Sequence, residues 1–245
     1  MPDSQPQPSD GATADSTALL LCGARLTDGR IVDVRLSGGL IEAVGTAGSL
    51  SPHSSRVDLS GYLLLPAPAE AHGHGDTALT ADSAGPVSYE TDDVQRRATE
   101  AALLQLGHGA TALRSHVRIG DVQGLGPLEA VLQARRSLRG LADLTAVAVP
   151  RLLTGTAGAD GLAMLRDAVK MGAGVVGGCP DADPDPSGYA ETVLEVAAEH
   201  GCPVDLHTHG DDPARLARLA APRSGVAHSR SLIGEYREIV ALPGV

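Results

Sequence analysis

One strand–helix–strand unit stands out in the second half of the chain: LTAVAVPRLLTGTAGADGLAMLRDAVKMGAGVVGG, residues 144–178. An apolar run at 144–149 is stopped by Pro150, a helical pattern follows at about 160–171, and a second apolar run lies at 174–178. Short apolar runs bounded by glycine and proline are typical of buried strands. The unit therefore predicts two parallel strands joined by a helical crossover.

The same alternation extends in both directions from this unit. The other predicted elements are, in order, a helix at 91–104, a strand at 111–116, helices at 128–138 and 189–200, a strand at 204–207, a short helix from Pro213, a strand at 224–228 and a helix at 233–242. This alternation of strands and helices fits two folds, a doubly wound sheet and a (β/α)8 barrel.

A histidine or arginine lies where five of the predicted strands end: His72, His116, Arg151, His207 and His228. In a barrel the carboxyl ends of all strands open on one face, where sites form. The chain has neither a G-x-G-x-x-G after a strand nor a P-loop, which weakens the case for a nucleotide-binding sheet. We therefore predict an α/β fold of the (β/α)8 TIM-barrel type that is incomplete, with about six of the eight strand–helix units. The open strand edges of such a barrel predict a homo-oligomer.

The segment before the barrel has a different pattern. Residues 1–17 are rich in Ser, Pro and Asp and predict a disordered tail; they lack the basic and apolar regions of a signal peptide, which favours a cytoplasmic protein. Residues 18–66 predict a small β-sandwich-like module, and 67–245 the barrel. The strands expected in the module are 18–22, 29–36, 40–44, 57–59 and 62–65.

Composition excludes several classes of function. The 245 residues carry 19 Lys+Arg against 30 Asp+Glu, a net charge of −11, and only four Tyr with no Phe or Trp. A nucleic-acid or anionic-membrane surface is therefore not expected, nor is a membrane helix, because no apolar run reaches about 20 residues. The three cysteines suggest buried fillers rather than a disulfide framework. Asp181, Asp183 and Asp185 predict a solvated acidic loop, since EF-hand spacing is not met.

Two histidine motifs suggest metal chemistry. His72 and His74 lie two residues apart on an extended segment, so their side chains point the same way and can hold one cation. An apolar strand leads to His207, with His209 two residues further on. Neutral imidazoles suit zinc, iron or nickel. The competing interpretations are a polar loop with chance histidines at the first motif and a solvated His/Asp turn at the second.

Taken in order, these motifs resemble the amidohydrolase superfamily and, within it, the cytosine-deaminase-like branch. The residues that carry the resemblance are 61–66 with 71–74, 114–117, 144–150, 171–177, 204–207 and 227–229. The resemblance implies that His72, His74 and His207 bind one divalent zinc or iron ion. It also implies that His228 handles the proton of the activated water and that His116 lies near the substrate pocket. The family's reaction is attack of a metal-activated hydroxide on a ring or amide carbon of a small molecule.

The chain departs from the family at three places. Gly210 stands where the family has an acid/base Glu, and His209, Asp211 or Asp212 are the candidate substitutes. Arg151 stands where the branch has a Gln that binds the pyrimidine, and a guanidinium would prefer a carboxylate, phosphate or carbonyl-rich ligand. The family's Asp after strand 8 has no counterpart.

These departures leave three hypotheses for the function. The first is a metal-dependent amidohydrolase that hydrolyses a C–N bond of a small nitrogen heterocycle or cyclic amide. The second is a shortened, non-catalytic relative that binds a ligand or partner. The third is an α/β protein whose histidines are incidental. Metal analysis separates the third from the others, and turnover separates the first from the second.

Overall fold

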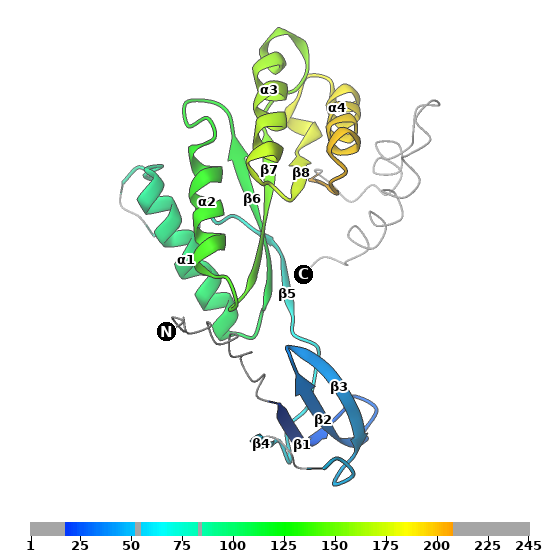
Figure 1. Cartoon of the computed structure of the whole chain (residues 1–245). Coiled ribbons are helices and arrows are strands. Elements are labelled where there is room, and N and C mark those ends of the chain that lie inside the picture. Colours follow the sequence, from blue (N-terminus) through cyan, green and yellow to red (C-terminus); the bar gives the residue numbers. More distant parts are fainter. Residues whose placement is uncertain (1–17, 52–54, 83–84, 208–245) are drawn as a thin grey trace, which may run out of the picture. The chain divides into compact units, whose positions relative to one another are not determined.

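The structure is a computed structural model that describes residues 18–51, 55–82 and 85–207 (Figure 1). The chain divides into two compact units, Met1–Pro66 and Ala67–Val245. Each unit has its own sheet, and the two sheets differ in how their strands are paired.

The first unit contains one four-stranded sheet in the order β3-β2-β1-β4. Its strands are β1 (Leu19–Arg25), β2 (Ile31–Ser37), β3 (Leu40–Thr46) and β4 (Ser55–Asp58). β1, β2 and β3 pair antiparallel, and β4 pairs parallel to β1. Gly38 and Gly39 both have positive φ, which lets the chain turn tightly between β2 and β3.

The strand predicted at 62–65 is wrong. The segment forms only an isolated bridge between Arg25 and Leu63, supported by backbone bonds from Arg25 N to Tyr62 O and from Leu64 N to Arg25 O. The following Pro66 has no N–H to donate, so the ladder does not continue.

The second unit contains a five-stranded sheet in the order β5-β6-β7-β8-β9, and every pair is parallel. The strands are β5 (Ala69–Gly73), β6 (Ala112–Ile119), β7 (Asp143–Pro150), β8 (Val175–Gly178) and β9 (Val204–Leu206). The helices are α1 (Thr91–Gly107), α2 (Gly126–Ser137), α3 (Gly155–Met171), the short 3-10 helix η1 (Pro180–Ala182) and α4 (Pro186–His200).

The strand order settles which of the two parallel folds is present. A doubly wound sheet reverses its strand order at a switch point, whereas a barrel adds each strand beside the previous one. Here spatial order equals chain order without reversal, and the helices follow one another around the curled sheet (Figure 1). The described part of this unit is therefore half of a barrel of the TIM type, as predicted.

The core lies between the sheet and these helices. Leu113, Val117 and Ile119 of β6 pack with Leu128 of α2 and Leu165 of α3 in one buried cluster. Burying a side chain of this size stabilises the fold by about 1.5–3 kcal/mol. Small residues fill the rest of this core, so the helices and strands approach one another closely. At Gly178, for example, an added Cβ would lie 2.2 Å from the buried Tyr189 hydroxyl.

Two helices begin earlier than predicted, each for a local reason. α3 starts at Gly155 rather than 160, and its glycines at 158 and 161 lie directly on the preceding Leu152–Leu153 backbone. Glycines are poor helix formers, which hides this first turn in the sequence. α4 starts at Pro186 because the Asp185 carboxylate accepts a hydrogen bond from Gly188 N at 3.0 Å.

Candidate active site

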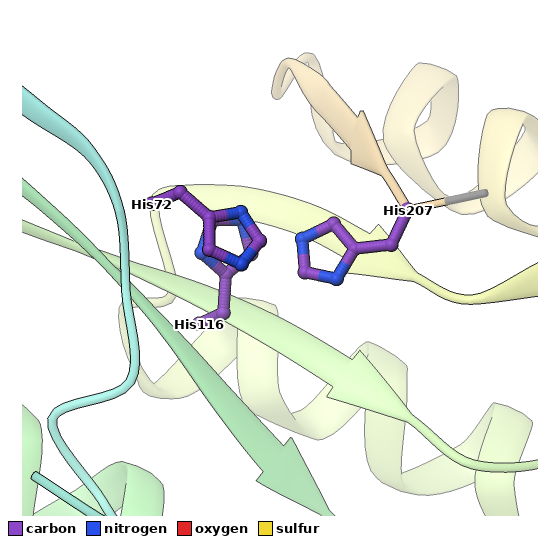
Figure 2. A group of neighbouring side chains, drawn as sticks. All are labelled: His72, His116 and His207. Carbon is purple, nitrogen blue, oxygen red and sulfur yellow. The ribbon is translucent and has the colours of Figure 1, made fainter. Parts of the chain in front are cut away.

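Three histidines from distant parts of the chain converge toward the carboxyl end of the parallel sheet. The prediction that a strand ends at His116 is wrong, because β6 continues past it to Ile119. His72 comes from β5, His116 from β6 and His207 from the residue after β9. Their ring centroids lie 4.3 Å apart for His72–His207 and 4.5 Å apart for each of the other two pairs. Figure 2 shows the rings of His72 and His116 overlapping, with that of His207 turned toward them.

The donor atoms of these rings fit a single cation. One nitrogen from each of the three rings lies within 4.8 Å of the other two. His116 Nδ1 and His207 Nε2 are buried and have no hydrogen-bond partner among the residues that the structure describes. Buried nitrogens without a partner are costly in an empty site, so the cluster has the donor set of a transition-metal centre.

His74 lies beside this cluster. Its Nε2 is 3.2 Å from His72 Nε2, and its ring centroid is 5.8 Å from that of His116 and 6.2 Å from that of His207. The structure thus brings together His72, His74 and His207, the three residues that the resemblance assigned to a metal. It adds His116, which the resemblance assigned to the substrate pocket.

The carboxylate of Asp205 lies next to the His116 ring. Asp205 Oδ2 lies 3.2 Å from His116 Nε2 and 2.8 Å from Arg114 Nη1. Burial opposes the charge, but His116 and Arg114 outweigh it and lower the pKa of Asp205 to about 2. The carboxylate lies beside Nε2, which forms no hydrogen bond in the described part of the chain, so it acts on the ring through its charge.

Two of the imidazoles, those of His72 and His207, favour the neutral form. Burial, together with the neighbouring His116 and His72 rings, lowers the pKa of His207 to about 4. Burial and the neighbouring rings also lower the pKa of His72. Both side chains are therefore uncharged near neutral pH and have a lone pair to offer a cation.

Buried polar contacts hold the loop that carries His74. Gly75 N donates to Ser115 Oγ at 2.9 Å, and Arg118 N donates to Asp76 Oδ2 at 3.3 Å. The buried Arg97 guanidinium donates to the backbone oxygen of Asp76. Burial raises the pKa of the Asp76 carboxyl. These contacts attach the segment after β5 to β6 and α1.

A cavity of about 530 Å³ opens above the histidines. His74, His116 and His207 form part of its lining, and Arg151 at the end of β7 lines it as the sequence suggested. Arg151 Nη1 lies 3.6 Å from Asp121 Oδ1. The polar side chains of the wall that the sequence analysis did not single out are Tyr89, Arg118, Asp121, Gln123 and Cys179.

The signal for some of these residues was present in the sequence. Asp205 precedes His207 by two residues on one predicted strand, so it shares a face with a candidate ligand. Arg118 follows His116 by two, but it lies beyond the strand predicted at 111–116 and on β6 only in the structure. The predicted catalytic residues His209, Asp211 and His228, with Gly210 and Asp212, lie outside the described residues. Their roles stay predictions.

The fold is similar to that of amidohydrolase barrels. No family model matches the chain. A curated relative, the N-isopropylammelide isopropyl amidohydrolase of Pseudomonas sp. (strain ADP), is 27% identical over 177 residues, which are 62% of this chain and 43% of the relative.

Two solved structures of amidohydrolases have a similar fold. The 5-methylcytosine deaminase from Klebsiella pneumoniae, liganded with 5-fluorocytosine, matches with a TM-score of 0.71 and 25% identity over 82% of this chain and 54% of its own. The N-isopropylammelide isopropylaminohydrolase from Burkholderia multivorans ATCC 17616 matches with a TM-score of 0.68 and 24% identity over 91% and 58%. The chain thus spans about half the length of these relatives. The resemblance to the amidohydrolase superfamily and its cytosine-deaminase-like branch is confirmed.

The part of the chain that was searched contains no helix long and apolar enough to cross a membrane.

Proposed function

We propose that this protein is a metal-dependent amidohydrolase that hydrolyses a C–N bond of a small nitrogen heterocycle or cyclic amide. The observation that carries the proposal is the convergence of His72, His116 and His207, with His74 beside them, at the carboxyl end of the parallel strands. Relatives whose names specify C–N hydrolysis or deamination support the reaction class.

The donor set fits one divalent transition metal ion, zinc or iron. His72, His74 and His207 would hold it, and His116 offers a further nitrogen in the same cluster. When bound, such an ion supplies Lewis-acid polarisation and lowers the pKa of water toward 7, which makes a nucleophile at neutral pH.

The protein's own residues contribute orientation and proton handling. The carboxylate of Asp205, itself paired with Arg114, would orient the ring of the fully buried His116 through its charge. Arg151 and the other wall residues of the 530 Å³ cavity would orient the substrate over the histidines. We assign proton transfer to His228, with His209 and Asp211 as the candidates for the role of the family's Glu.

Metal content of the full chain, measured by elemental analysis, tests the metal site. We expect about one equivalent of zinc or iron in the wild type and loss of uptake in His72→Ala and His207→Ala, because each removes a nitrogen ligand. His200→Ala, an exposed histidine at the end of α4, is the matched control and should keep its metal. A wild-type chain without metal would refute the proposal.

Ammonia or amine release from cytosine and N-isopropylammelide tests the reaction. Turnover that depends on His72 and His207 supports the amidohydrolase. Metal uptake without turnover over a panel of heterocycles would favour the non-catalytic relative, for which Gly210 in place of the family's Glu is the specific observation. The homo-oligomer predicted from the sequence is a further expectation, which light scattering of the full chain checks.

A further inference from the structure

The face of the sheet that bears the histidines also carries two arginines on β6. Arg114, His116 and Arg118 alternate along this strand, so all three side chains lie on the same face. Arg114 is paired with Asp205 at 2.8 Å. Arg118 lines the cavity above the cluster, and its guanidinium forms no ion pair with any residue in the described part of the chain.

A second guanidinium follows the end of the neighbouring strand β7, two positions beyond the residue that faces Arg118. In the parallel register, Arg118 is opposite Val149 and Ile119 is opposite Pro150, so Arg151 follows at the adjoining strand end. Arg151 also lines the cavity, and Asp121 Oδ1 lies 3.6 Å from its Nη1. Asp121 has a φ of 51°, unusual for a residue other than glycine, in a turn closed by reciprocal backbone bonds between Gly120 and Gly124. Such a conformation persists only where its surroundings require it.

The charge of this wall is opposite to that of the whole protein. Among the described lining residues, two arginines stand against the single carboxylate of Asp121. The chain as a whole carries −11. A guanidinium binds a carboxylate through two parallel hydrogen bonds.

We propose that the substrate of this site is a heterocycle that bears a carboxylate, and that Arg118 and Arg151 bind this group while the ring lies toward the histidines. The inference rests on the proposed function for the identity of the ring as substrate. Arg118 and Arg151 are the specificity-determining residues, and the Asp121 carboxylate competes with the substrate for Arg151.

Calorimetry on the full chain with orotate, a carboxylated pyrimidine, and with uracil, the same ring without the carboxylate, tests the inference. Binding is measured with and without bound zinc, because a metal ion also attracts anions and the zinc-free protein isolates the arginines. We expect orotate to bind about 10- to 100-fold more tightly than uracil in both forms, the range for charge-assisted hydrogen bonds.

Three variants sharpen this test. Arg118→Gln/Arg151→Gln should abolish the preference for orotate. Asp121→Asn, which removes the competing carboxylate and tolerates positive φ, should increase it. The control, Arg136→Gln/Arg139→Gln, removes the same charge from exposed arginines at and after the end of α2 and should leave the preference unchanged.

The outcomes separate this inference from the proposed function. Absence of any orotate preference in both forms of the wild type overturns the inference, as does a preference that survives Arg118→Gln/Arg151→Gln. Inorganic phosphate that competes with orotate at equal concentration also contradicts it, because the two arginines would then not select a carboxylate. Loss of the proposed function is seen differently, as a wild-type chain that takes up no metal while the arginines still select orotate.

Discussion

On β6, the face packed against the helices and the face that carries the histidines have opposite chemistry. Leu113, Val117 and Ile119 belong to the buried cluster with α2 and α3, whereas Arg114 and His116 contact Asp205 on the other face. One residue step along the strand therefore separates a side chain that stabilises the fold from one that serves the site. Substitutions on the two faces should consequently have separable effects on the free energy of unfolding and on metal affinity.

The largest loss of stability is expected on the helix-covered face. Leu128 of α2 is fully buried, so Leu128→Ala leaves a cavity and should lower the free energy of unfolding by about 2–5 kcal/mol. Zinc affinity of the folded protein should stay the same. Urea unfolding measures the free energy of unfolding, and competition with a chelating dye measures the zinc affinity. Leu141→Ala, at a side chain 56% exposed, is the control and should change stability by under about 0.5 kcal/mol.

The matching test on the histidine-bearing face is Asp205→Asn. The amide removes the charge that orients His116 and pairs with Arg114, so zinc affinity should fall about 10- to 100-fold. The same competition assay measures this fall. Asp167→Asn removes an exposed carboxylate that is paired with Lys170 and should leave zinc affinity unchanged. Unaltered affinity in Asp205→Asn would show that His116 is oriented by its packing alone.

Asp183 belongs to neither face of β6. It lies where the loops that follow β7 and β8 meet. It was predicted to be solvated, and that prediction is wrong, because the side chain is only 5% exposed. Its carboxylate accepts bonds from Leu153 N at 2.9 Å, Asp185 N at 2.9 Å and Thr154 N at 3.2 Å, and from the Thr154 hydroxyl. Burial opposes the charge, but these bonds outweigh it and lower the pKa of Asp183.

The lowered pKa of Asp183 determines the direction in which the free energy of unfolding changes with pH. The folded state holds the Asp183 carboxylate more strongly than the unfolded chain, so its contribution is present above the ordinary pKa of about 3.9 and is lost as the pH falls through the lowered value. Asp183→Asn should cost about 1–3 kcal/mol at pH 7 and flatten the fall in stability toward pH 3. Urea unfolding from pH 7 to pH 3 measures both, and Asp160→Asn on the exposed side of α3 should retain the wild-type slope.

Local sequence patterns predict the strands and the histidine motifs, but not the polar contacts between distant residues. Strand β7 and the His72, His74 and His207 group are signalled by local patterns, an apolar run before Pro150 and histidines two residues apart. The contact of Arg114 with Asp205 joins residues 91 positions apart, and no local pattern encodes that pairing. The same holds for Asp183, whose partners Leu153 and Thr154 lie 30 and 29 positions earlier in the loop after β7.

The smallest expected effect concerns the one polar residue on the apolar face of β6. Ser115 is buried, yet its Oγ accepts a hydrogen bond from Gly75 N in the loop that carries His74. Ser115→Ala leaves that N–H without this partner and should cost about 0.5–1.5 kcal/mol of stability. Because the loop holds His74, zinc affinity should fall as well, by about 2- to 5-fold.

This substitution decides how strictly the two faces are independent. Ser137→Ala, which removes an exposed hydroxyl bonded within α2 at 3.3 Å, is the matched control and should change neither quantity. A fall in stability with unchanged zinc affinity would mean that His74 is held by Asp76 and Arg97 alone, and the two faces would then be fully separable. A fall in both would show that one hydrogen bond through the sheet couples the packed face to the histidines.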